Sequence, residues 1–246
     1  MENPRSYKTK QEFALAPFNF SSMRSTTLLI GCFFVLVKTQ GQNLVLNPSF
    51  EEKIGCPNAG NWSSGSIDSA KFWTQPFRSS DYFYPCSWNW THSTPQNALG
   101  YQQPRSGVAF AGIYGYIYGD NIPPDAREYV EGHLSTQLLK DSVYKIEFFV
   151  SLAEGNSDGA SDMIGAYLSK ELIKYNITPP DVADVLPFKP QVSSLKGHVL
   201  ADTTNWMRIC GYYKAEGGES FITIGNYLPN SEITYLHIKI QHGRKS

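Results

Sequence analysis

The sequence has few charged residues and few cysteines, and it lacks the short motifs that mark common enzyme sites. Charged residues make up 17% of the 246 residues, and there are only 4 cysteines and 5 histidines. No two cysteines have the CxxC spacing of a zinc site. Neither HExxH nor Gly-x-Ser-x-Gly occurs, and the histidines are scattered. We therefore expect no zinc site, and we expect no enzyme.

An apolar run near the start predicts a cleavable signal peptide. A basic start at Met23 and Arg24 precedes the apolar residues 26–37, and small or polar residues follow up to Gly41. The run is too short to span a bilayer, so no transmembrane span is expected in the mature chain. Two alternatives stay open: a buried strand or helix, and a lipoprotein signal ending at Cys32. Met23 is an alternative start to Met1.

The chain after this leader has a mildly acidic balance. Residues 1–41 hold five of the 21 basic and two of the 22 acidic residues, which leaves 16 basic and 20 acidic residues in residues 42–246. No basic block is present to neutralise phosphates. Nucleic acid and anionic membranes are therefore not expected as partners.

Three cysteines follow the predicted leader. Cys56 and Cys86 lie in proline-containing loops, and in an oxidising compartment they could be bridged. Closing a loop of about 30 residues would contribute roughly 3–4 kcal/mol in the chain-entropy model. Cys210 lies in a segment predicted to be a strand, so we expect it to be a buried free thiol.

Short alternating segments predict strands along most of the chain. The clearest covers residues 142–152, where Tyr144, Ile146, Phe148 and Val150 share one face. A hairpin is expected between residues 206–215 and 221–227, across a Glu-Gly-Gly-Glu turn. One helical turn is expected at residues 170–175. Further strands are expected at residues 43–51, 108–118, 127–138 and 163–169.

These segments predict an all-β fold. Many short strands, 20 glycines, 15 prolines and no alternation of strands with helices favour an antiparallel β-sandwich, specifically a jelly roll. Nothing divides residues 42–246, so they are expected to form a single domain. Residues 54–106 are expected to be long loops held by aromatic side chains, and Trp73 and Trp206 are expected in the core.

The opening segment NLVLNPSFE, residues 43–51, resembles the start of galactose-binding-like jelly-roll carbohydrate-binding modules. Closer still, the chain is similar to modules in secreted or surface proteins of gliding gram-negative bacteria. There the module often precedes an OmpA-like domain or a sorting tail. The resemblance covers residues 43–227, and its further motifs are YQQP at 101–104, AGIY at 111–114, IGAY at 164–167, LPFKPQ at 186–191, DTTNW at 202–206 and ITIGNY at 222–227.

The end of the chain departs from that pattern. Such modules usually close with a Tyr-x-x-Asp-Asp-Val strand beside the first strand, whereas residues 233–246 read ITYLHIKIQHGRKS. Either residues 235–240 replace the closing strand, or the sequence is truncated or frame-shifted after Tyr227.

The resemblance implies an exported, non-catalytic module that binds a glycan, at the cell surface, outside the cell or on the periplasmic side of the outer membrane. Aromatic faces suit the C–H surface of a sugar, and amide or charged groups suit its hydroxyls. The alternative function is a structural or adhesion module that docks another envelope protein; a polysaccharide hydrolase is a third. The candidate ligand-binding residues are Trp62, Trp88, Asn89, Trp90, Gln102, Gln103, Arg105, Tyr116, Tyr118 and Asp120.

No cofactor is expected, with the exception of a structural calcium ion. Related jelly rolls often bind calcium near the first strand, and Glu51 is the matching carboxylate. The late aspartate that usually joins it is missing here.

Overall fold

A computed structural model describes residues 41–57, 65–77, 79–116, 125–155, 157, 159–174 and 185–238. The chain divides into two units, Met1–Gly41 and Gln42–Ser246, and the fold below is that of the second. The predicted signal peptide and the helical or lipoprotein alternatives fall outside the described residues and stay predictions.

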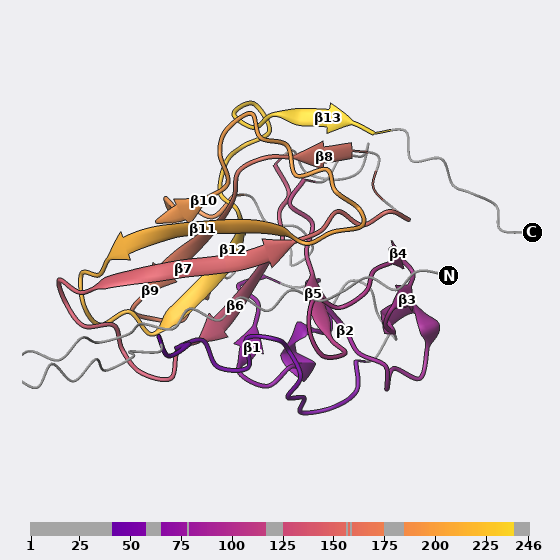
Figure 1. The fold of residues 1–246 in the computed structure, drawn as a ribbon, viewed down its shortest axis with the longest axis horizontal. Coiled ribbons are helices and arrows are strands. Elements are labelled where there is room, and N and C mark those ends of the chain that lie inside the picture. Colours follow the sequence, from indigo (N-terminus) through magenta and orange to yellow (C-terminus); the bar gives the residue numbers. More distant parts are fainter. Residues whose placement is uncertain are drawn as a thin grey trace, which may run out of the picture. The chain divides into compact units, whose positions relative to one another are not determined.

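The described residues form an all-β fold with antiparallel pairing (Figure 1). None of their helices is long and apolar enough to cross a membrane. Two short 3₁₀ helices occur, η1 (Ile67–Ser69) and η2 (Trp90–His92). The strands are β1 (Trp73–Thr74), β2 (Asp81–Phe83), β3 (Gln96–Asn97), β4 (Gly100–Tyr101), β5 (Phe110–Gly112), β6 (Tyr129–His133), β7 (Val143–Val150), β8 (Gly159–Ser161), β9 (Ile164–Ser169), β10 (Val192–Ser193), β11 (Met207–Lys214), β12 (Phe221–Asn226) and β13 (Tyr235–His237).

The largest sheet has five strands in the order β1-β6-β12-β9-β10. The long strands β7 and β11 form a separate antiparallel pair, seen side by side in Figure 1. Ile146 of β7 and Ile209 of β11 share one hydrophobic cluster with Ile222 of β12 and Leu168 of β9. The β7–β11 pair therefore packs on the five-stranded sheet, and the main core lies between them.

Strand β7 confirms the predicted alternation. Ile146 is buried, and Tyr144, Phe148 and Val150 pack against the same cluster. Lys145 is on the opposite face, as expected for side chains that alternate across a pleated strand.

The predicted hairpin between residues 206–215 and 221–227 is wrong. Strand β11 pairs with β7, while β12 lies between β6 and β9. Gly217 and Gly218 take positive φ values of +94° and +95° in the link, and the Glu219 carboxylate accepts hydrogen bonds from the backbone N–H groups of Glu216 and Gly217. The turn residues were recognisable, but here the turn carries the chain from one sheet to the other.

The prediction that Cys210 is buried is also wrong. Cys210 is a free cysteine and is exposed. It lies opposite Glu147, whereas its neighbour Ile209 faces the core. Because side chains alternate between faces, a register shift of one residue moves a side chain from the core to solvent.

The first segment, expected to be a strand, forms an isolated β-bridge and is held by backbone and side-chain hydrogen bonds together. Val45 forms one antiparallel bridge with Leu134. The buried Asn47 donates to the carbonyl oxygens of Glu52 and Lys71 at 2.7 and 2.9 Å, which fixes the Asn-Pro turn. Phe50 is half-buried, and its ring centroid lies 4.5 Å from that of the buried Trp73.

The last described strand, β13, does not lie beside the first segment. Strand β13 pairs with β8 and not with the first segment, so it does not occupy the position expected of a closing strand. The helical turn expected at residues 170–175 is absent over residues 170–174, and residue 175 lies outside the described part. The strands expected at 108–118 and 127–138 are shorter, because pairing with neighbouring strands covers only β5 and β6.

The disulfide joins Cys56 to Cys86, with their Cα atoms 5.6 Å apart. It ties two loops of the region that was expected to lack regular structure. There the described residues contain only very short strands and the two 3₁₀ helices.

Candidate functional site

A cavity of about 240 Å³ opens between the β2–β5 pair, the end of β7 and strand β8. Its lining combines aromatic rings with carboxylates, amides and hydroxyls. The polar lining residues are Asp81, Asn97, Gln102, Glu128, Ser151, Glu154, Ser157 and Ser161, and the aromatic ones are Phe83, Tyr101, Phe110, Tyr114, Tyr116, Phe149 and Trp206.

The aromatic part of the wall is built by contacts between rings. Phe83 and Phe110 stack across the β2–β5 pair with centroids 5.1 Å apart. The Phe110 ring meets Trp206 edge-on at 5.9 Å, and the Trp206 indole N–H donates to the Gln103 carbonyl at 2.8 Å. Trp206 is half-buried in the cavity wall. The assignment of Trp206 to the core is therefore wrong, because it lies just before β11, where its ring reaches across to residue 103.

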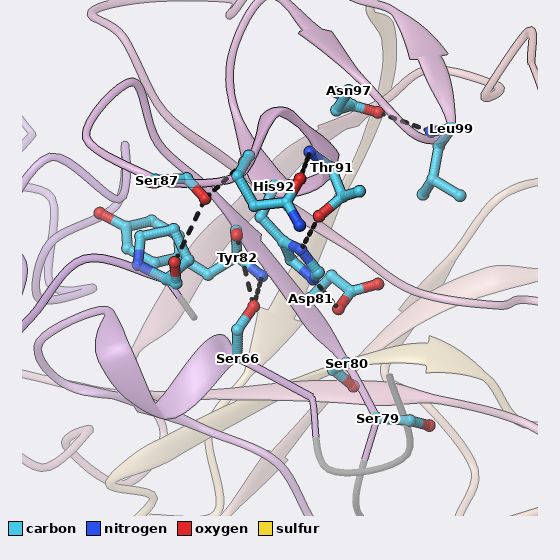
Figure 2. Close-up of polar contacts among 12 residues, drawn as sticks. Ser66, Ser79, Ser80, Asp81, Tyr82, Ser87, Thr91, His92, Asn97 and Leu99 are labelled. Carbon is cyan, nitrogen blue, oxygen red and sulfur yellow. Dashed lines mark hydrogen bonds and ion pairs between the residues drawn. The ribbon is translucent and has the colours of Figure 1, made fainter. Parts of the chain in front are cut away.

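A buried carboxylate–imidazole pair stands beside the cavity. Asp81, at the start of β2, lies 3.0 Å from His92 Nε2, and both side chains are almost fully buried. The other ring nitrogen of His92 lies 3.1 Å from Thr91 Oγ1. Figure 2 shows His92 lying between these two partners. Burial raises the pKa of Asp81, and the bond to His92 opposes that rise.

Glu128 is the second buried carboxylate of the wall. Its side chain accepts hydrogen bonds from the Ser79 hydroxyl and from the Tyr114 backbone N–H. Burial raises the pKa of Glu128 to about 7; the Ser79 hydrogen bond opposes this rise, and the nearby Asp81 adds to it. Glu128 is thus poised to exchange a proton near neutral pH.

Short side-chain contacts hold the mouth of the cavity. Gln102 Oε1 accepts from Ser151 Oγ at 2.7 Å, and Glu154 Oε1 accepts from the Tyr101 backbone N–H at 3.1 Å. Gly100 has a φ of +122°, and a Cβ there would lie 2.7 Å from the Gly155 backbone nitrogen. Glycine at this position lets the two loops approach closely.

The structure brings together only part of the predicted ligand-binding set. Gln102 and Tyr116 line the cavity. Gln103 contributes its carbonyl to Trp206, and Arg105 lies over the Phe149 ring at 3.5 Å, but neither side chain lines the wall. The remaining members are Trp88, Asn89 and Trp90, which lie outside the lining, and Trp62, Tyr118 and Asp120, which lie outside the described residues.

Trp88 and Trp90 lie on the surface of the loop that contains η2. They are 74% and 64% exposed. Between them, Asn89 accepts a hydrogen bond from the Thr91 backbone N–H and so caps the 3₁₀ helix. These tryptophans form an open aromatic surface that is separate from the cavity lining.

Sequence reasoning missed Asp81, Glu128 and Glu154. Asp81 starts β2 and Glu128 directly precedes β6, each beside a tyrosine, whereas Glu154 lies in the loop after β7. A carboxylate at the start of such a strand is a usable signal, because buried charges are rare without a functional or structural partner. Their convergence on one cavity depends on the folded arrangement.

Glu51 bears on the calcium prediction. Its Oε1 accepts hydrogen bonds from the backbone N–H groups of Val108 and Ala109 at 2.9 and 3.2 Å. N–H groups carry a positive partial charge, so this oxygen is not arranged for a cation. The described residues contain no group of three or more His, Cys, Asp or Glu side chains that could hold a metal. The calcium ion stays a prediction, and nothing below depends on it.

Comparison with protein-family models gives no match, and neither curated proteins nor solved structures give one.

Proposed function

We propose that the chain is an exported, non-catalytic jelly-roll module that binds a glycan in the cavity lined by Trp206, Gln102 and Glu128. The observation that carries the proposal is the combination of aromatic rings and hydrogen-bonding groups in one concave wall. Aromatic faces pack on the C–H surface of a sugar, while amides and carboxylates accept its hydroxyl hydrogens.

The size of the cavity favours a small part of a glycan. Its volume of about 240 Å³ lies below the roughly 300–1,000 Å³ typical of sites for drug-sized ligands. We infer that it takes one sugar unit, such as a chain end, while the rest of the glycan stays outside.

Two structural features support export and the sandwich fold. The Cys56–Cys86 disulfide suits an oxidising compartment. The packing of the β7–β11 pair on the five-stranded sheet agrees with a two-layer β-sandwich, and the jelly-roll connection is the proposed form of that sandwich. The cell surface or the envelope is the proposed location.

A glycan array and an insoluble-polysaccharide pull-down test the function, with tryptophan fluorescence as the readout of binding. Trp206→Ala is expected to weaken binding about tenfold, as expected for the loss of one stacked ring, and Trp206→Phe to weaken it less. The matched control is the double change Trp88→Ala and Trp90→Ala. If only the control loses binding, the ligand lies on the exposed tryptophans and the cavity proposal is wrong.

A second candidate, a hydrolase, is favoured by one observation. Asp81 and Glu128 line the same cavity, and burial raises the pKa values of both, that of Glu128 to about 7. A paired acid and base of this kind can cleave glycosidic bonds. Turnover on a polysaccharide panel that disappears in Glu128→Gln would establish it; binding without turnover supports the non-catalytic module.

A further inference from the structure

We propose that the cavity prefers a ligand carrying a protonated amine, such as an amino sugar, over neutral and acidic sugars. This inference rests on the proposed sugar site and names its ligand class. It comes from the lining, which contains three carboxyl side chains and, among the described residues, no lysine, arginine or histidine.

Three carboxylate residues line the cavity, namely Asp81, Glu128 and Glu154. Among the described lining residues there is no lysine, arginine or histidine. Arg127 precedes the lining residue Glu128 and Arg208 follows the lining residue Met207, but neither arginine is part of the lining. The ionisable side chains of the described lining are therefore acidic carboxyl groups and tyrosines.

Neutral donors hold two of these carboxyl groups, and burial raises the pKa of Glu128 to about 7, so Glu128 is only partly charged at pH 7. Glu128 is held by the Ser79 hydroxyl and a backbone N–H, and Glu154 accepts a backbone N–H. These donors are neutral. Only Asp81 has an ionisable partner, His92.

Two arginines approach the aromatic wall from outside the lining. Arg105 lies over Phe149, and Arg127 lies 5.8 Å from the centroid of the Tyr116 ring. Neither side chain lines the cavity.

An ammonium group suits both kinds of wall. It donates charge-assisted hydrogen bonds to carboxylates, and it is attracted to the faces of tyrosine and tryptophan rings. A uronic acid would instead bring a negative charge next to these carboxyl groups, where no described lining residue supplies a cation. A neutral acetylated amine would fill the same space without the ionic contact.

The test compares matched sugars at pH 7 by isothermal titration and tryptophan fluorescence. The probes are glucosamine and its short β-linked oligomers, the same compounds N-acetylated, and the corresponding uronates; spermidine serves as an amine without a sugar. The amino sugars are expected to bind at least about tenfold more tightly than the acetylated ones, the loss expected for one charge-assisted hydrogen bond.

Glu154→Gln keeps the side-chain shape and the acceptor for the Tyr101 N–H while removing one charge. It is expected to weaken binding of the amino sugar more than binding of the acetylated sugar. Glu147→Gln is the matched control, because Glu147 lies outside the cavity lining, where it pairs with Lys145 and Arg208. This control is expected to bind like the unaltered protein.

The outcomes separate the two proposals. Equal or tighter binding of acetylated or acidic sugars overturns the charge inference and leaves the sugar site standing. Binding of spermidine with no binding of any sugar supports the charge inference and overturns the glycan site. No binding of any probe by the folded protein overturns both.

Discussion

Glu131 is a fully buried carboxyl group on β6, outside the candidate site. Its Oε1 accepts from the Ile173 N–H at 3.0 Å and from the Thr223 hydroxyl at 3.3 Å, while Oε2 has no hydrogen-bond partner in the described structure. Burial raises the pKa of Glu131 to about 7. A protonated carboxyl group fits this position better than a carboxylate does.

This raised pKa makes stability depend on pH. The folded state holds the Glu131 proton up to pH near 7, whereas the unfolded chain loses it near its ordinary pKa of 4.5. Stability is therefore lost as pH rises through that window, by roughly 3 kcal/mol at most. Glu131→Gln should remove this loss and be more stable than the unaltered protein at pH 8 in urea unfolding. If the difference in unfolding free energy between Glu131→Gln and the unaltered protein is the same at pH 4 and pH 8, this account is wrong.

The Asp81–His92 pair gives a second prediction. Asp81→Ala leaves a buried imidazole without its carboxylate, so the free energy of unfolding should fall by about 3 kcal/mol. Asp141→Ala is the control, because Asp141 and Lys214 form an ion pair whose side chains are both 66% exposed, and its loss should cost less than about 1 kcal/mol. Chemical denaturation at pH 7 measures both. A loss at Asp81 no larger than that of the control would show that the buried pair contributes nothing to stability.

At the scale of elements, the connection around β3 and β4 depends on a close approach of two loops. Gly100→Ala would add a Cβ 2.6 Å from Glu154 Cγ and strain a φ of +122°. Gly197→Ala is the control, since its φ is +83° but nothing lies within 4 Å. We expect Gly197→Ala to cost about 1 kcal/mol and Gly100→Ala clearly more, with weaker ligand binding as well. Equal melting temperatures for the Gly100→Ala and Gly197→Ala variants would show that the loops around Gly100 and Gly155 separate easily.

Strand positions were more predictable than strand partners. The alternation around Ile146 predicted β7 and its buried face, because that pattern is local. The pairing of Arg208 with Glu147, 61 residues away, leaves no local trace. For the same reason Gln102 and Tyr116 were identified by residue type, whereas the meeting of Asp81 with Glu128 was not. Contacts between residues far apart in the sequence depend on tertiary packing, and they cannot be predicted from composition.

At the scale of the whole molecule, the Cys56–Cys86 bridge holds loops that have little sheet structure of their own. Replacing both cysteines with serine should lower the free energy of unfolding by about 3–4 kcal/mol. Comparing thermal unfolding of the variant with that of the oxidised protein measures this loss. Cys210→Ser is the control, because Cys210 is exposed and unbridged. An unchanged melting temperature in the double variant would mean that the loops are held by packing alone.

The order of strands in the five-stranded sheet has a consequence for how the chain acquires its structure. Strand β6 forms its central contacts with β12, as in the Glu131–Thr223 bond across 92 residues. A nascent chain cannot close this sheet until β12 has been synthesised. Because loop-closure entropy must be overcome before such distant contacts form, folding should be slow, on a timescale of roughly milliseconds to seconds. A polypeptide that stays short of its native structure this long can still be threaded through a translocation channel, as the proposed export requires.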